Sequence, residues 1–124
     1  MDSLLPQIVD SFPYPLLVFT SKGIIVLANP AFLKETGMSQ SDIVKNKYNI
    51  FYNNCDNFQL NNAANQVFFG KTFLIEYLKN PLSIFLKTIP KHKDVSSKAF
   101  DKAIVFPVYD DHGMITNGVM AFID

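Results

Sequence analysis

Two short apolar runs near the start of the chain restrict its possible folds more than any other feature. They cover residues 16–19 and 24–28, and the turn 20–23, which contains Gly23, separates them. Short runs rich in β-branched residues and joined by a glycine turn predict a β-hairpin. Asn29 and Pro30 follow directly, and they predict a helix, because asparagine is a good N-cap and proline suits the first helical position.

The middle of the chain is predicted to be helical. The helix that follows the hairpin should end at Gly37, because glycine readily adopts the left-handed conformation of a C-cap. Ser39 and Asp42 have the spacing of a capping box with aspartate in place of glutamate, which predicts a second short helix. After an asparagine-rich irregular stretch, apolar residues return at helical spacing over 57–69, and Gly70 should end that helix.

The last part of the chain is predicted to form strands. The expected segments are 72–79, 83–89, 103–109 and 115–123. We expect the turn between the last two at 110–113, since the alternative turn at Asn117-Gly118 would leave shorter strands. Antiparallel strands with helices between them predict an α+β domain and argue against alternating strand–helix units.

The predicted strands lack a polar face. An antiparallel sheet with one face in water should alternate apolar and polar residues, whereas the runs 16–19 and 24–27 are apolar on both sides. Residues 3–12 predict an amphipathic helix that covers part of the second face, but a helix of this length spans only roughly 15 Å. We therefore expect a homodimer to cover the rest, with an interface formed by the apolar stripe of that helix: Leu4, Leu5, Ile8, Val9 and Phe12.

Composition narrows the possible partners and the compartment. The 124 residues suit a single domain, and 11 basic and 11 acidic side chains give no net charge. Every basic residue is lysine, so the chain lacks the arginine forks that grip phosphates, and we expect no nucleic-acid partner. A single cysteine, an acidic start and the lack of an apolar run near the ~20 residues of a membrane span predict a cytoplasmic protein without membrane insertion.

Three segments carry residues at positions typical of one domain family. They are the hairpin with its following helix, the helix end that leads into a strand with Glu76, and the closing hairpin up to Asp124. The matching residues are Gly23, Asn29, Ala31, Phe32, Thr36, Gly37, Gly70, Lys71, Glu76, Pro107, Gly113, Gly118 and Asp124. Through them the chain resembles the PAS family over about 12–124, although 79–100 is longer than the family usually allows. The resemblance implies a five-stranded antiparallel sheet with short helices on one face, formed by 13–124 and preceded by an N-terminal helix over 1–12.

The resemblance also implies a function in signalling. A PAS domain receives a signal or dimerises, and it regulates an attached output domain such as a histidine kinase; Asp124 then begins the junction that relays the signal. Such domains often hold a small apolar ligand between the sheet and the middle helices. By resemblance the walls are Tyr48, Phe51, Tyr52, Phe58, Leu60, Ala64, Phe68, Tyr77, Phe106 and Val119. The alternative is that these side chains fill a solid core and the domain is purely a protein-interaction module.

No cofactor, metal or catalytic group is expected. In flavin-binding relatives the reactive cysteine falls at the position of Tyr48, and Cys55 lies seven residues later, with Asp56 where an arginine normally follows. Heme would need an axial ligand on the middle helix, but His92 lies in a lysine-rich loop and His112 in a turn. These residues also lack the spacing of a zinc site. No nucleophile with a base stands out, so we expect no enzyme.

Overall fold

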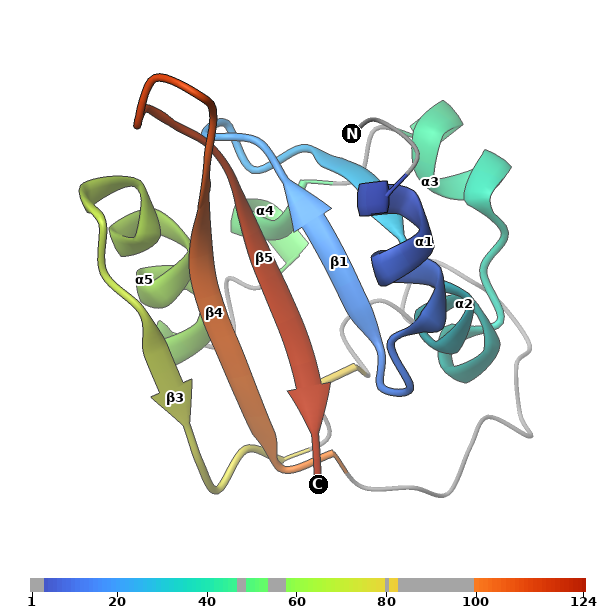
Figure 1. Ribbon diagram of the computed structural model, residues 1–124. Helices are drawn as coiled ribbons and strands as arrows, with labels where there is room; N and C mark the ends of the chain where they lie inside the picture. Colours follow the sequence, from blue (N-terminus) through green and yellow to red (C-terminus); the bar gives the residue numbers. More distant parts are fainter. Residues whose placement is uncertain (1–3, 47–48, 54–57, 80, 83–99) are drawn as a thin grey trace.

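The computed structural model describes residues 4–46, 49–53, 58–79, 81–82 and 100–124 (Figure 1). In chain order the elements are α1 (Leu4–Ser11), β1 (Leu16–Phe19), β2 (Ile25–Ala28), α2 (Pro30–Thr36), α3 (Gln40–Asn46), α4 (Ile50–Asn53), α5 (Phe58–Gln66), the 3-10 turn η1 (Val67–Phe69), β3 (Phe73–Ile75), β4 (Lys102–Tyr109) and β5 (Ile115–Ile123).

The five strands form one antiparallel sheet in the order β2-β1-β5-β4-β3, which confirms the predicted α+β fold. The closing hairpin β4–β5 supplies the longest pairing, from Lys102↔Ile123 to Tyr109↔Ile115. In Figure 1, α4 and α5 lie behind the sheet and α1 lies on its near side, next to β1. The sheet therefore has an inner face toward α4 and α5 and an outer face toward α1.

Local hydrogen bonds set the element ends where the sequence predicts them. The Asn29 side-chain oxygen accepts from the Phe32 amide at 2.9 Å, so Asn29 caps α2. Gly37 has a φ of 76° and donates its N–H to the Leu33 carbonyl at 2.8 Å, which ends the helix. Ser39 and Asp42 cap each other, each main-chain amide donating to the other's side chain at 3.0 Å.

The closing turn also lies at its predicted place. Asp110 Oδ1 accepts from the amides of His112 and Met114, at 2.8 and 3.0 Å, and holds the turn that precedes β5. Asn117 and Gly118 lie within β5.

Two predicted elements differ from those in the structure, and a third lies outside the described residues. The strand predicted over 72–79 is wrong in length, because β3 covers only Phe73–Ile75 and Tyr77 has a φ of 62°, which turns the chain out of the extended conformation. The helix over 57–69 tightens into the 3-10 turn η1 before Gly70. The strand predicted over 83–89 lies outside the described residues.

Two hydrophobic clusters occupy the two faces of the sheet. The larger one, between the sheet and the helices behind it, includes Phe19, Phe32, Ile43, Leu60 and Phe122. The smaller one, on the outer face, contains Val9 of α1 with Leu16, Val119 and Ala121. Apolar side chains therefore pack on both sides of the sheet, which explains why the strands show no polar alternation.

Candidate functional site

Some of the predicted pocket residues are part of the solid core. Leu60 and Ala64 of α5 are fully buried among core side chains. Phe68 packs on the same cluster, with its ring 5.9 Å from that of Phe19 in an edge-on arrangement. Phe51 is partly buried against it. These four residues therefore belong to, or pack against, the main hydrophobic cluster.

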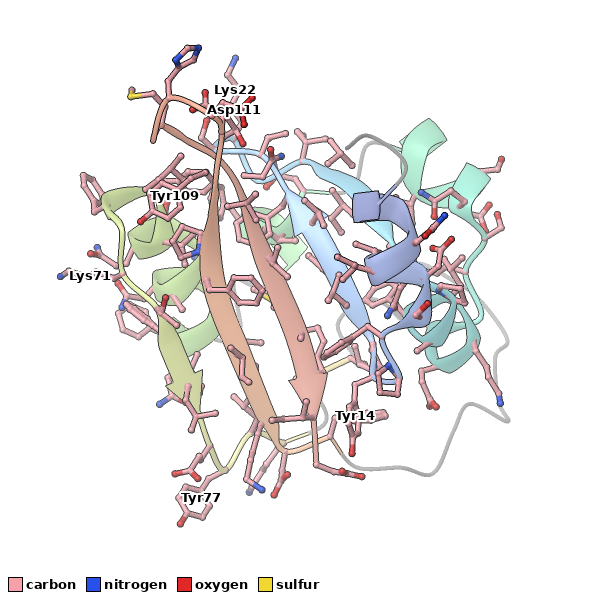
Figure 2. The ribbon with its side chains drawn as sticks, in the orientation of Figure 1. Tyr14, Lys22, Lys71, Tyr77, Tyr109 and Asp111 are labelled. Atoms are coloured by element: carbon pink, nitrogen blue, oxygen red, sulfur yellow. The ribbon has the colours of Figure 1, made fainter. Side chains whose placement is uncertain are left out.

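Other predicted pocket residues do not lie beside this core. Phe106 and Val119 are directly paired across β4 and β5, and both belong to the outer cluster with Val9 of α1. Because side chains alternate along a strand, they lie on the face opposite α5, and their predicted place in the inner pocket is corrected. Tyr77 lies beyond the end of β3 and is 89% exposed (Figure 2). Tyr48 and the side chain of Tyr52 are outside the described part of the chain.

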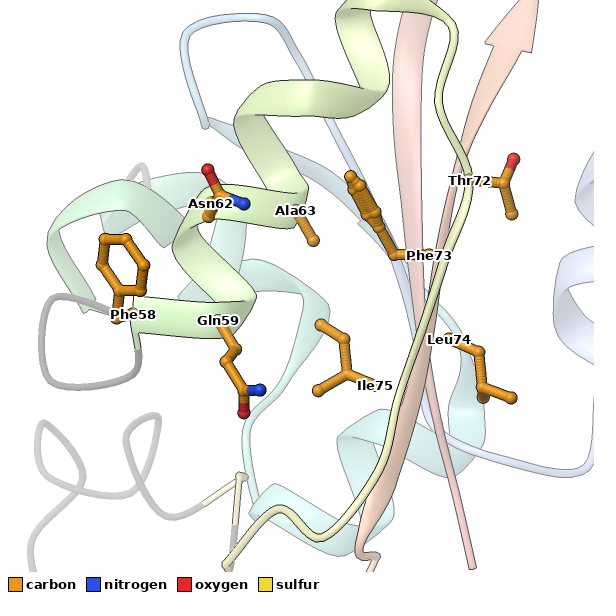
Figure 3. A pocket seen from close by; sticks show the side chains of 8 residues that line it. All are labelled: Phe58, Gln59, Asn62, Ala63, Thr72, Phe73, Leu74 and Ile75. Atoms are coloured by element: carbon orange, nitrogen blue, oxygen red, sulfur yellow. The ribbon is translucent and has the colours of Figure 1, made fainter.

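An open groove lies beside the core, between α5 and β3 (Figure 3). Its volume is about 420 Å³, within the usual range for small-molecule sites. Phe58 is the predicted pocket residue that lines it. The described residues that line it are Phe58, Gln59, Asn62, Ala63, Thr72, Phe73, Leu74 and Ile75.

The two walls of this groove differ in character. Phe73 and Ile75 point into it from β3, while the side chains of Thr72 and Leu74 point away, so these two residues line it with their main chain (Figure 3). The opposite wall carries the amides of Gln59 and Asn62. This wall was not predicted from the sequence, because polar residues on a helix ordinarily indicate a solvated face. The i, i+3 spacing of the two amides was the available signal.

The predicted dimer residues divide between two environments. Val9 is buried on the outer face, and Phe12 packs against the same cluster, so both are covered within one chain. Ile8 is 55% exposed on α1. The side chains of Leu4 and Leu5 lie outside the described part of the structure.

The outer face extends beyond the reach of α1. Leu74 of β3 is 61% exposed. The register pairs it with the partly buried Ile104 of β4, and Phe106 and Val108 continue the same face along β4. We call Leu74, Ile104, Phe106 and Val108 the open half of the outer face.

The remaining candidate residues are exposed and separate. Asp124 follows the end of β5 and Glu76 follows β3, while His112 lies in the β4–β5 turn. Cys55 and His92 lie outside the described residues. Across the described ranges, no three His, Cys, Asp or Glu side chains gather to hold a metal ion. In the same part of the chain, no helix has both the length and the apolar character needed to cross a membrane.

Comparisons with known proteins agree with this architecture. The PAS domain of Bordetella pertussis BvgS has a TM-score of 0.57 at 14% identity, over 98% of this chain and 83% of that one. A sensory box sensor histidine kinase from Vibrio cholerae has a TM-score of 0.61 at 13% identity, over 99% and 90%. The structure of VqmA bound to DPO has a TM-score of 0.65 at 14% identity, over 100% and 57%.

These identities show the fold alone, and no curated protein matches the chain in sequence. A family model described as PAS fold matches residues 3–77, from α1 past the end of β3. That match covers more than half of the chain and includes the hairpin, the capped helices and both walls of the groove. The chain belongs to the PAS family.

Proposed function

We propose that this PAS domain is a cytoplasmic sensory module that binds a small, mainly apolar molecule and regulates an attached output domain, such as a histidine kinase. The observation that carries the proposal is the open groove between α5 and β3. A sensor histidine kinase and VqmA bound to DPO have the same fold, which supports a sensory role and a small ligand for this chain. We assign it no catalytic step and no nucleic-acid partner.

The register of the sheet connects this groove to the C-terminus. Ile75, which points into the groove, pairs with Ala103, and Ala103 pairs with Phe122, two residues before Asp124. A ligand that moves β3 against α5 would act on β4 and then on the end of β5. Asp124 would relay that movement to the output domain, because packed strands shift together rather than bend independently.

The burial of two predicted pocket residues supports a second candidate function. Leu60 and Ala64 are fully buried and belong to the main hydrophobic cluster. The same chain would then act as a pure interaction module that transmits a signal through contacts between proteins. In either case we propose that two copies associate through the exposed side of α1 and the open half of the outer face.

Native mass spectrometry of the protein purified from cells, followed by denaturation, tests the ligand. A mass above that of the chain, lost on unfolding, is expected for an occupied groove. Replacing Asn62, an exposed residue of the groove lining, by Phe should abolish this added mass by filling the groove, whereas Met114→Leu, in an exposed turn, should not. If the native and denatured proteins have the same mass in every preparation, no ligand is bound, and the interaction module is the correct function.

Analytical ultracentrifugation at tens of micromolar tests the dimer. Ile8 and Leu74 are 55% and 61% exposed, so Ile8→Lys with Leu74→Lys should leave the fold intact. This pair of changes should convert the dimer to a monomer, because each dimer would bury four unpaired charges. Met114→Lys is the control, since Met114 is 65% exposed but lies in the β4–β5 turn. A wild-type chain that sediments as a monomer would disprove the dimer.

A further inference from the structure

Among the residues that the structure describes, no charged side chain lines the groove between α5 and β3. The lining consists of four apolar side chains in α5 and β3, two side-chain amides, and Thr72 and Leu74. Lys71 and Glu76 stand just outside the two ends of β3, both exposed and opposite in sign. An ionised ligand would give up part of its hydration here without gaining an ion pair.

The polar side chains of the groove are neutral and can both donate and accept hydrogen bonds. Gln59 and Asn62 lie on one face of α5, and each side chain carries both a carbonyl acceptor and an NH₂ donor. Among the described residues, neither side-chain amide is engaged in a hydrogen bond with the protein. Both are therefore available to a ligand, in either direction.

The opposite wall also offers both donors and acceptors, in this case from the main chain. In the described part of the sheet, β3 is the last strand and pairs with β4 only. In an antiparallel strand, residues alternate in the side to which they direct N–H and C=O, so an edge strand keeps some of both groups unpaired. Thr72 and Leu74 line the groove through the main chain (Figure 3).

Apolar surface lies between these polar walls. Phe73 and Ile75 point into the groove next to Ala63 (Figure 3). Phe58 also lines the groove and is 79% exposed, so its ring is available to cover a flat ligand. The volume of about 420 Å³ accommodates one or two rings.

From these features we infer that the groove selects a neutral molecule that has a flat apolar body and an amide-type edge. By an amide-type edge we mean a hydrogen-bond donor and an acceptor next to each other. The inference rests on the proposed sensory function, because it names the chemical class of ligand for the same site. The amide edge pairs with Asn62 and Gln59 on one side and with the free edge of β3 on the other. The flat body lies on Phe73 and Ile75.

Three molecules of one shape test the selection for neutrality. Benzamide, benzoate and benzamidinium differ mainly in charge, and each is titrated into the ¹⁵N-labelled chain while amide cross-peaks are followed by NMR. Benzamide should shift the main-chain signals of Thr72–Ile75 and the side-chain NH₂ signals of Gln59 and Asn62. Benzoate and benzamidinium should need about tenfold higher concentration or more for the same shift, because neither finds a counter-charge.

A single substitution should reverse this preference. Asn62→Asp keeps the size of the side chain but replaces the donor with a negative charge, so benzamidinium should then bind more tightly than benzamide. Asn65→Asp makes the same chemical change on the same helix outside the groove lining and should leave the order unchanged. Asn62 and Asn65 are both exposed, so both variants should keep the dispersed spectrum of the folded chain.

The outcomes separate the inference from the function on which it rests. If benzoate or benzamidinium shifts the groove signals at concentrations equal to or below that of benzamide, the groove binds ligands but the selection for a neutral amide is wrong. An unchanged order of affinities in Asn62→Asp also overturns the inference. If none of the three molecules shifts the groove signals, the groove is not the ligand site and the proposed function fails with it.

Discussion

Gly118 should be intolerant of even one added carbon. It lies in β5 opposite Phe19 of β1. A Cβ built on it would lie 2.7 Å from Cε2 of the Phe19 ring and 3.0 Å from Cγ2 of Val67. Both side chains are fully buried, and Phe68 packs against the Phe19 ring from another side. The ring would therefore have to shift against buried neighbours to make room for the added carbon.

The expected loss follows from two opposing effects. Overpacking of a tight core costs typically about 1–3 kcal/mol. Replacing glycine also restricts the unfolded chain, which stabilises the fold by roughly 0.4–1 kcal/mol. Since the overlap involves fixed core atoms, we expect Gly118→Ala to lower the free energy of unfolding by about 2 kcal/mol. For a domain of this length the melting temperature should fall by roughly 6–10 °C.

Urea titration followed by circular dichroism, at one protein concentration, measures this loss. Gly113→Ala is the control, because its Cβ meets no atom within 4 Å and the change there reports only the strain at its φ of 79°. Phe19→Leu should relieve the overlap, so Gly118→Ala should cost about 1 kcal/mol less in that background. A loss below about 0.5 kcal/mol for Gly118→Ala in the wild-type background would refute the packing described around Phe19.

Three further predictions concern local structure and colour. Gly37→Val should lower the free energy of unfolding by about 1 kcal/mol or more, because Gly37 has a φ of 76°, and thermal melts without any loss would place the end of α2 elsewhere. Asn29→Asp should lower the free energy of unfolding, measured by urea titration, by about 1–3 kcal/mol. Aspartate can still cap α2 but cannot donate to the carbonyls of Phe12 and Tyr14, which the Asn29 amide reaches at 3.2 and 2.8 Å. A stability equal to that of the wild type would contradict these hydrogen bonds. The purified protein should be colourless, and Cys55→Ala should leave its absorption unchanged; a flavin or heme band in the visible spectrum would overturn this expectation.

The sequence by itself determined the features that depend on neighbouring residues. Asn29, Gly37 and the Ser39–Asp42 pair are recognisable because each makes a helix-capping hydrogen bond with a group three or four residues away. The turn at Asp110 is local in the same sense. Such signals are complete within a short window, and together with the family resemblance they predicted the five-stranded fold.

A very short helix, and a strand that ends at a residue other than glycine, were harder to predict. α4 has only four residues, which is too few to show a helical period. The end of β3 depends on the positive φ of Tyr77, a conformation that bulky residues rarely adopt and that no local pattern indicates. The predicted strand consequently extended past its true end and carried Tyr77 into the predicted pocket.

Only the tertiary structure decided which side of the sheet each strand residue faces. Phe106 and Val119 lie on the outer face, although nothing in their strands separates them from inward-facing neighbours such as Val105 and Met120. Alternation of polar and apolar residues is what normally identifies the two faces, and here both faces are covered by apolar contacts. The groove could not be predicted from the sequence for a related reason. Gln59 and Asn62 become part of a site only because the edge strand β3 packs beside α5 in the tertiary structure.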